Sequence, residues 1–376
     1  MPLDQTTVTR VDIWPLDVPL TDPFVVATGT KTTADNLFVR VTLRSGAVGY
    51  GEIAPFPEVG GADREAARRA AVRLTQAVLG RSAADWRDTA PTFGEGSVPG
   101  APTPDAAARC GIETALLDAW CRTRRTSVWH ALGAADVRPR ETDITIPIAG
   151  VDRSVALARG WHARGFRLFK TKVGADVGED IRRLEAIHRA CPGARFIADA
   201  NQGFSLPTCR AFLAALRRIG VPLELLEQPV PRDDWEGMAA LVRDGSVPVA
   251  ADESARSLAD VREIVARRAA DVINIKIMKC GVSEALEIAA AGRAAGLRLM
   301  IGGMVETRVA MGCSFGLVLG LGGFDFLDLD TPLLLAADPV SGGYRYEGPQ
   351  LVPWTGPGLG LELPLPVSPA DVTTLA

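Results

Sequence analysis

The 376-residue sequence has little of what marks several common classes of protein. It contains three histidines and six cysteines, and no two cysteines form a C-x-x-C pair. A zinc site and a disulfide framework are therefore disfavoured, and we expect the cysteines to be small buried side chains in a reducing compartment. Long apolar runs are lacking too. The most apolar stretch, residues 311–327, contains five glycines and Asp325, which argues against a membrane span.

Neither sign of charge dominates. The 41 basic and 45 acidic residues give a net charge of −4, so no broad positive field exists for a nucleic acid or an anionic membrane. The first fifteen residues lack the basic and apolar segments of a secretion signal. We therefore expect a cytoplasmic homo-oligomer whose partner is a small-molecule substrate, with no nucleic acid and no membrane as partner.

Lysine is the scarcest charged residue. Five of the 41 basic residues are lysine and the other 36 are arginine. Arginine serves equally well on a surface, but only lysine readily loses its proton and becomes a neutral base. Four of the five lysines stand in two short apolar segments, as Lys170, Lys172, Lys276 and Lys279. These positions are candidates for chemistry.

The first 132 residues have the pattern of an α+β module. Residues 8–14, 36–43 and 47–53 alternate in polarity like strands, with a Ser45-Gly46 turn between the last two. Helical patterns cover residues 63–79 and 105–121. Two strand-like pieces in residues 336–376 are expected to return to this module.

Residues 133–335 repeat a unit of a short β-branched run followed by a helical pattern. Alternating strands and helices predict parallel pairing, and eight units predict a closed α/β barrel of the TIM type. A doubly wound open sheet is the alternative, but the near-constant spacing of the charged run ends, 24 to 28 residues, favours a ring. The runs cover residues 143–148, 167–172, 195–199, 223–227, 247–252, 272–276, 297–301 and 324–328.

Three consecutive runs end in acidic residues, Asp199, Glu227 and Asp252. Barrel enzymes place their sites at the C-terminal ends of strands, and neighbouring strand ends lie about 4.8 Å apart. Three carboxylates at such distances repel one another unless a cation lies among them. Oxygen ligands without histidine or cysteine are typical of Mg²⁺ or Mn²⁺, so these residues are the predicted metal ligands.

Lys172 and Lys276 end the second and sixth runs, which face each other across a ring of eight. Racemisation or epimerisation needs two such groups, since one removes a proton and the other delivers one from the far side. Lys170 lies on the same strand face as Lys172, and we expect its charge to lower the pKa of that neighbour. The alternative is that these lysines only pair with the carboxylates, a role that arginine would also fill.

Five motifs in this order resemble those of the enolase superfamily, and within it those of the muconate lactonizing subgroup. They are Phe169-Lys170-Thr171-Lys172, Asp199-Ala200-Asn201-Gln202-Gly203, Glu227-Gln228-Pro229, Ala251-Asp252-Glu253-Ser254 and Asn274-Ile275-Lys276. The resemblance spans essentially the whole chain. It implies a modified (β/α)₇β barrel with an α+β capping domain. The capping domain would be formed by residues 1–132 together with the segment 336–376.

The resemblance also implies an activity. Its common step is removal of a proton α to a carboxylate, with Mg²⁺ stabilising the enediolate. Asp199, Glu227 and Asp252 would hold one Mg²⁺ per subunit. Lys172 and Lys276 would be the acid/base pair, and the supporting residues would be Lys170, Asn201 and Glu253.

The eighth run carries Asp328-Leu329-Asp330, which resembles the Asp-x-Asp signature of dipeptide epimerases. In that group the pair binds the α-ammonium of a dipeptide. The resemblance thus predicts an epimerase that converts L,L to L,D dipeptides, although a turn that happens to use two aspartates is an alternative. Further candidate substrate-binding residues are Thr145, Glu306 and Thr307.

Specificity is expected from two cap loops, residues 24–31 and 56–61. Epimerases of this group that act on Ala-Glu carry an arginine in the first loop, and that position is Gly29 here. Lys31 could substitute for it, and Glu58 could favour a cationic side chain. Most residues of the two loops, among them Phe56, are small or apolar. A substrate with a hydrophobic side chain is therefore expected, and Ala-Glu is not the expected substrate.

Two other interpretations stay open. One lysine could act as base and the other as a passive cation, which gives a muconate cycloisomerase or an o-succinylbenzoate synthase/N-acylamino acid racemase. A non-catalytic homologue would have lost at least one ligand or base, and all five positions are filled. Lys279 has no assigned role.

Overall fold

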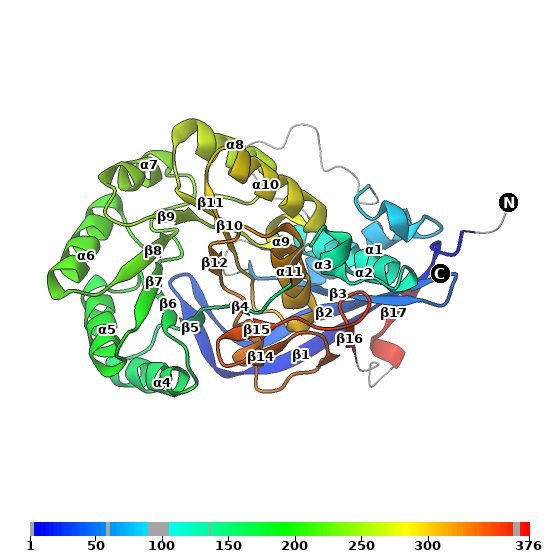
Figure 1. The fold of residues 1–376 in the computed structure, drawn as a ribbon, viewed down its shortest axis with the longest axis horizontal. Coiled ribbons are helices and arrows are strands. Elements are labelled where there is room, and N and C mark those ends of the chain that lie inside the picture. Colours follow the sequence, from blue (N-terminus) through cyan, green and yellow to red (C-terminus); the bar gives the residue numbers. More distant parts are fainter. Residues whose placement is uncertain (1–3, 58–60, 89–104, 135–136, 364–368) are drawn as a thin grey trace.

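The computed structural model describes residues 4–57, 61–88, 105–134, 137–363 and 369–376. Its strands form an antiparallel sheet in the capping module and a parallel sheet that curves into a barrel (Figure 1). In Figure 1 the barrel lies on the left, and the cap, with the C-terminus beside it, lies on the right. The predicted fold class, an α/β barrel with an α+β cap, is confirmed.

The capping sheet has the strand order β17-β1-β2-β3. Strand β17, near the C-terminus, pairs with β1, where Val11 lies opposite Leu375. Helix α2 packs closely on β3, where a side chain at Gly51 would collide with the backbone of Gly111. The elements of this module are β1 (Val8–Val26), β2 (Gly29–Leu43), β3 (Val48–Ile53), β17 (Thr373–Leu375), α1 (Arg64–Val78), η2 (Ala83–Asp85), α2 (Ala106–Thr123) and α3 (Val128–Ala131).

Strands β1 and β2 are much longer than predicted, and the expected loop at residues 24–31 is instead the tip of their hairpin. Phe24 pairs with Lys31, and Val26 pairs with Gly29. The prediction missed this extension because Pro15, Pro19 and Pro23 interrupt the alternation, and proline weakens a strand assignment. The hairpin reaches the barrel, as the Ile148 amide donates a hydrogen bond of 3.0 Å to the Val25 carbonyl.

The barrel sheet contains all eight predicted strands, in chain order. Each predicted run holds one strand, and β7 and β8 match the predicted limits residue for residue. The two edges of the sheet are joined by a hydrogen bond of 2.9 Å from the Asp143 amide to the Leu327 carbonyl. The strands are β5 (Ile144–Ile146), β6 (Leu168–Lys172), β7 (Arg195–Asp199), β8 (Leu223–Glu227), β9 (Val249–Ala251), β10 (Val272–Ile275), β11 (Arg298–Ile301) and β12 (Phe326–Leu327).

An α-helix follows each of the first seven barrel strands, and the short 3₁₀ helix η3 (Thr331–Leu333) follows the eighth, as a (β/α)₇β barrel requires. Several helices begin at a side-chain cap, among them α6 at Ser205 and α8 at Ser257. The helices are α4 (Val151–Ala163), α5 (Val177–Ala190), α6 (Leu206–Ile219), α7 (Trp235–Asp244), α8 (Leu258–Arg267), α9 (Ile277–Cys280), α10 (Val282–Ala294) and α11 (Arg308–Leu321).

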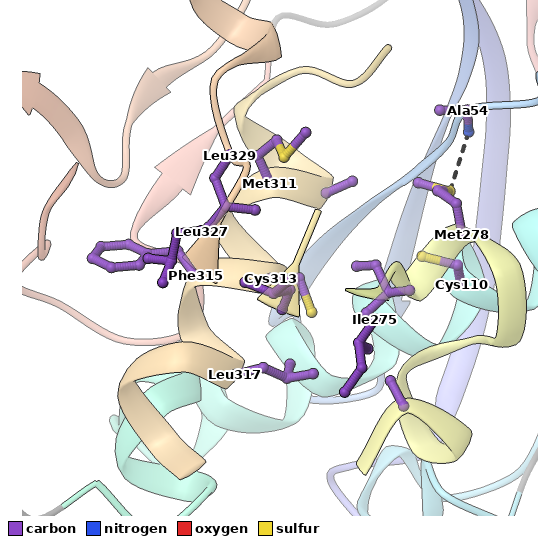
Figure 2. Packing of buried hydrophobic residues seen from close by; sticks show 14 of the residues in the cluster. Ala54, Cys110, Ile275, Met278, Met311, Cys313, Phe315, Leu317, Leu327 and Leu329 are labelled. Atoms are coloured by element: carbon purple, nitrogen blue, oxygen red, sulfur yellow. Dashed lines mark hydrogen bonds between the residues drawn. The ribbon is translucent and has the colours of Figure 1, made fainter. Parts of the chain in front are cut away.

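The cap and the barrel share an apolar core. Figure 2 shows Cys110 of α2 close to Met278 of α9, with Ile275 of β10 and residues of α11 beside them. The Ala54 amide contacts the Met278 sulfur at 3.5 Å. This packing fixes the cap over the C-terminal ends of the barrel strands.

The remaining strands form two small sheets, β13 with β16 and β14-β15-β4. They comprise β4 (Arg140–Glu141), β13 (Ser341–Gly342), β14 (Arg345–Glu347), β15 (Gln350–Val352) and β16 (Leu361–Glu362), and η4 (Pro369–Asp371) precedes β17. The segment after residue 335 therefore holds more strands than the two predicted. Among the described residues, no helix has the length and apolarity needed to cross a membrane.

Candidate active site

Strand pairing defines which side chains share a level inside the barrel. Asp199 is level with Lys172 and Glu227, because β7 pairs with β6 and β8 at these residues. Glu227 is level with Ala250, so Asp252 lies one step higher on the same face of β9. The predicted metal ligands thus lie at the ends of three adjacent strands, and all three are buried.

Both predicted bases contact this carboxylate group. Lys172 donates from Nζ to Asp199 Oδ2 at 2.6 Å, and Lys276, directly after β10, donates to Asp252 Oδ2 at 2.7 Å. Each lysine therefore reaches the carboxylates from its own side of the barrel. Both are about 95% buried, which excludes an ordinary surface role.

Lys170 lies deeper than Lys172 and joins the carboxylates to the eighth strand. Its Nζ is 3.1 Å from Asp199, 2.9 Å from Glu227 and 2.6 Å from Asp328. Burial opposes a charge on this lysine, but the three carboxylates raise its pKa well above the ordinary value. Lys170 is thus a permanent positive charge beside the site.

The carboxylates differ strongly in proton affinity. Burial alone would raise the pKa of Asp199, but Lys172 and Lys170 lower it to about 2. Burial and the charge of Asp199 raise the pKa of Glu227 to about 8. The pKa of Lys276 is raised by Asp252 against the effect of burial, so this lysine carries a proton in the protein alone.

Asn201 and Glu253, predicted as supporting residues, form a chain of contacts behind Lys172. The Lys172 ammonium donates to Asn201 Oδ1 at 3.1 Å, and Asn201 Nδ2 donates to Glu253 Oε1 at 3.2 Å. The Asn201 backbone amide also donates to Asp199 at 3.1 Å. These contacts fix the position of the Lys172 amine.

Lys279, which the sequence left without a role, anchors Asp252. Its Nζ donates to the Asp252 carboxylate at 2.7 Å and to the Asp252 and Asn274 carbonyls at 2.6 and 2.9 Å. Asn274 in turn donates to Glu227 at 2.8 Å. The fourth lysine of the two apolar segments is therefore a positioning residue.

The Asp328-x-Asp330 pair belongs to a second carboxylate group, which includes Asp143. Oxygens of these three residues lie within 4.8 Å of one another. Asp330 accepts a hydrogen bond of 2.5 Å from the Thr145 amide. Sequence reasoning missed Asp143, which directly precedes β5, because its contact depends on closure of the barrel between the first and eighth strands.

A narrow cavity lies between these groups and the cap. Its polar wall contains Thr145, Lys172, Lys276 and Asp328, and its apolar wall contains Phe24, Val26, Phe56 and Met304. The cavity has a volume of about 20 Å³, room for about one water molecule, so wall side chains must move to admit a substrate. Of the predicted cap residues, Phe56 thus lines the cavity.

Gly29 and Lys31, two further predicted cap residues, are not among the residues that line the cavity. Lys31 is held by Asp35 at 2.6 Å and by the Pro55 carbonyl at 3.0 Å, with its ammonium 5.1 Å from the Phe56 ring centre. Gly29 lies in the turn end of the hairpin, and Glu58 is outside the described residues. The expectation that Lys31 replaces an arginine therefore conflicts with its contacts.

Glu306 and Thr307 are also not among the lining residues of the cavity, whose wall here is Gly303 and Met304. Thr307 caps helix α11 and donates from its hydroxyl to Glu52 of the cap at 2.8 Å. Glu306 accepts from the Met304 amide at 2.7 Å, and burial together with Glu52 raises its pKa to about 8. Thr307 therefore joins the cap to the barrel, and Glu306 braces the segment after β11.

The predicted metal ligands fit Mg²⁺ by their chemistry. Asp199, Glu227 and Asp252 are buried carboxylates from adjacent strands, and oxygen donors are what this ion prefers. Within the described part of the chain, however, the carboxylate oxygens that lie within 4.8 Å of one another are those of Asp143, Asp328 and Asp330. Each predicted ligand is also paired with a lysine ammonium: Asp199 with Lys172, Asp252 with Lys276 and Glu227 with Lys170.

Known proteins resemble this chain along nearly its whole length. Curated relatives include an aromatic dipeptide epimerase of Herpetosiphon aurantiacus, 43% identical over 95% of this chain and 99% of that protein. A hydrophobic dipeptide epimerase of Citrifermentans bemidjiense is 36% identical over 92% of this chain and 94% of its own. A solved dipeptide epimerase of Cytophaga hutchinsonii, in complex with Mg and D-Ala-L-Val, superposes with a TM-score of 0.89 at 26% identity, covering 98% of this chain and 99% of that one.

Family models divide the chain in the same way as the structure. Residues 7–133 match the N-terminal domain of mandelate racemase and muconate lactonizing enzyme, and residues 153–366 match the enolase C-terminal domain-like family. The second match covers more than half of the chain and contains every predicted metal ligand and both lysine bases. The chain therefore belongs to the enolase superfamily, in the group of mandelate racemase and muconate lactonizing enzymes.

Proposed function

We propose that this protein is a Mg²⁺-dependent dipeptide epimerase that converts L,L to L,D dipeptides by inverting the α-carbon of the second residue. The observation that carries the proposal is the position of Lys172 and Lys276. They extend from opposed strands, β6 and β10, into the wall of one cavity. The relatives named as dipeptide epimerases support the same reaction.

The two lysines would exchange one proton across the substrate carbon. Lys172 is positioned by Asn201, and Lys276 is paired with Asp252 and protonated. A carbon held between them loses its proton to one amine and receives a proton from the other on the opposite face, which inverts its configuration. Lys170 adds a fixed positive charge on the carboxylate side.

Asp199, Glu227 and Asp252 would hold the metal. A bound Mg²⁺ would supply positive charge at the substrate carboxylate and so acidify the neighbouring C–H group. Oxygen donors also suit Mn²⁺, but the solved relative named above contains Mg, which favours this ion. We propose in addition that the protein is a homo-oligomer.

Asp328 and Asp330 would bind the α-ammonium of the dipeptide. Both are buried, and Asp328 lines the cavity. Lys170 supplies one positive charge to Asp328, and the ammonium of a dipeptide would supply a second, which favours a buried pair of carboxylates. A muconate cycloisomerase or o-succinylbenzoate synthase acts on substrates without a free amine, so this pair favours the epimerase.

A hydrophobic side chain on the second residue fits the cap. The apolar wall of Phe24, Phe56 and Met304 offers no charge, and Lys31 is held by Asp35. A glutamate side chain would therefore find no free cation among these described cap residues, so we do not expect Ala-Glu to be the preferred substrate.

Solvent deuterium tests the reaction. The protein is incubated with Mg²⁺ in D₂O and a library of L,L dipeptides, and mass spectrometry follows incorporation of deuterium at the second residue. We expect exchange with epimerisation for dipeptides whose second side chain is apolar. Absence of exchange across the whole library would contradict the proposed function.

A further inference from the structure

A second cavity adjoins the catalytic cavity on the side of the first barrel strand. It has a volume of about 230 Å³ and lies between helix α4, the stem of the β1–β2 hairpin and η3. Phe24 and Thr145 line both cavities, so the two are neighbours with a shared wall. Nothing in the reaction described above uses this space.

The wall of the second cavity is mainly apolar. Leu157 and Trp161 lie one turn apart on the same face of α4, and Leu333 and Leu334 face them from η3 and its end. All four are partly exposed rather than buried in the core. Apolar side chains that line a concave, partly open space are typical of a site for an apolar group.

The charged residues at this cavity already have partners. Asp22 forms an ion pair with Arg153 of α4. The Arg164 guanidinium lies over the Trp161 ring, 4.2 Å from its centre, and so orients that ring. The charge of Asp22 is therefore compensated, and Arg164, stacked on Trp161, is the cationic part of a mainly apolar wall.

Backbone hydrogen bonds hold the walls in place. The Thr21 amide donates to the Leu334 carbonyl at 2.9 Å, which ties the hairpin stem to η3. The Ile148 amide donates to the Val25 carbonyl at 3.0 Å, which ties the hairpin to the segment after β5. A cavity with such fixed walls is preformed, and binding to it costs little ordering.

The second cavity lies next to the site proposed for the substrate ammonium. This position indicates which part of the substrate would occupy it, an inference that rests on the proposed function. Thr145, which lines it, donates its amide to Asp330, one of the two residues proposed to bind the substrate ammonium. In a dipeptide the first side chain branches from the carbon that carries this ammonium. We propose that the second cavity, the first-residue pocket, binds an apolar side chain of the dipeptide's first residue.

The test compares two series of dipeptides on the full-length protein with Mg²⁺. In one series the first residue varies from Gly and Ala to Leu and Phe before a constant Leu; in the other the second residue varies after a constant Ala. Leu157→Trp should fill the pocket and Leu157→Ala should enlarge it. Leu213→Trp, on the outer helix α6 and away from both cavities, is the matched control.

We expect Leu157→Trp to lower kcat/KM for Leu-Leu and Phe-Leu about tenfold or more relative to Gly-Leu, and to leave the second series unchanged. Leu157→Ala should shift the preference toward Phe-Leu. An equal change at every first residue, a change confined to the second series, or the same pattern in Leu213→Trp would overturn the pocket.

Calorimetric dissociation constants for both series separate this proposal from the proposed function. Dipeptides that bind without exchanging deuterium contradict the epimerase, while a first-residue trend in Kd that follows the size of residue 157 still supports the pocket. A Kd series that ignores the first residue overturns the pocket even where epimerisation is observed.

Discussion

Two levels of the barrel interior, only two residues apart on each strand, have opposite chemistry. The lower level, here called the floor, consists of seven apolar side chains: Leu168, Ile197, Leu225, Ala250, Val272, Met300 and Phe326. Adding two to each number gives the upper level, the ring: Lys170, Asp199, Glu227, Asp252, Asn274, Gly302 and Asp328. The strand register is staggered, since it places Lys170 opposite Ile197, Glu227 opposite Ala250 and Asn274 opposite Met300. Each ring residue nevertheless lies two residues beyond a floor residue on its own strand.

This contrast shows how the barrel divides its work. The floor removes apolar surface from water and closes the barrel below the site. The ring carries five ionisable residues that are nearly all buried, an arrangement that costs stability unless charges pair or a ligand compensates them. Changes in the floor should therefore affect folding, and changes in or directly above the ring should affect chemistry.

The largest effect is expected from the bases above the ring. Lys172→Arg and Lys276→Arg keep the positive charge but cannot provide a neutral amine. We expect each to lower kcat for epimerisation by about 10³-fold or more, with a small change in melting temperature. Near wild-type turnover in either variant would mean that the lysine acts as a passive cation, as in the cycloisomerase interpretation.

The next effect concerns the floor. Ile197→Ala and Met300→Ala each remove a fully buried side chain and should lower the free energy of unfolding by about 2–5 kcal/mol. Denaturant titration measures this loss. Turnover per folded molecule should stay close to that of wild type, and a drop in turnover without a loss of stability would break the distinction between the two levels.

Mg²⁺ should stabilise the folded protein by binding to carboxylates of the ring, and not to the floor. At a Mg²⁺ concentration a hundred times the Kd, binding to the folded chain adds about 2.7 kcal/mol, which chelation with EDTA removes. Asp199→Asn should abolish this increment in thermal unfolding, whereas Met300→Ala should retain it. Equal Mg²⁺ stabilisation in both variants would place the metal elsewhere.

A smaller effect should come from Asp143, the carboxyl that directly precedes β5. It is fully buried, and burial with the charges of Asp328 and Asp330 raises its pKa well above the ordinary value. A carboxyl with a raised folded pKa contributes stability that is lost as pH rises above about 3.9, the unfolded value.

Asp143→Asn removes this titration. Its melting temperature should therefore fall less between pH 5 and pH 8 than that of wild type. Asp233→Asn, at an exposed site, controls for the loss of a negative charge as such. A pH dependence of Asp143→Asn identical to that of wild type would show that Asp143 does not carry the effect.

The strands could be predicted from the repeating pattern, and the charged residues of the ring because the second to sixth runs end in or beside an ionisable residue. Asp199 and Glu227 are both the last residue of a strand and a member of the ring. Asp143 escaped prediction since its partners come from the far end of the barrel. The contact between Thr307 and Glu52 could not be predicted because it depends on how the cap folds onto the barrel. The ion pair of Lys31 with Asp35 lies within β2, a strand whose extension through residues 29–35 the sequence pattern did not predict.

The central claim, two bases on opposite faces of one carbon, is tested most directly by stereospecific exchange in D₂O. Lys172→Ala and Lys276→Ala should each fail to epimerise a dipeptide that wild type accepts. Each variant should still exchange the α-proton of one epimer, through the lysine that remains, and the two variants should act on opposite epimers. Exchange of the same epimer by both variants, or of both epimers by either one, would contradict the two-base account.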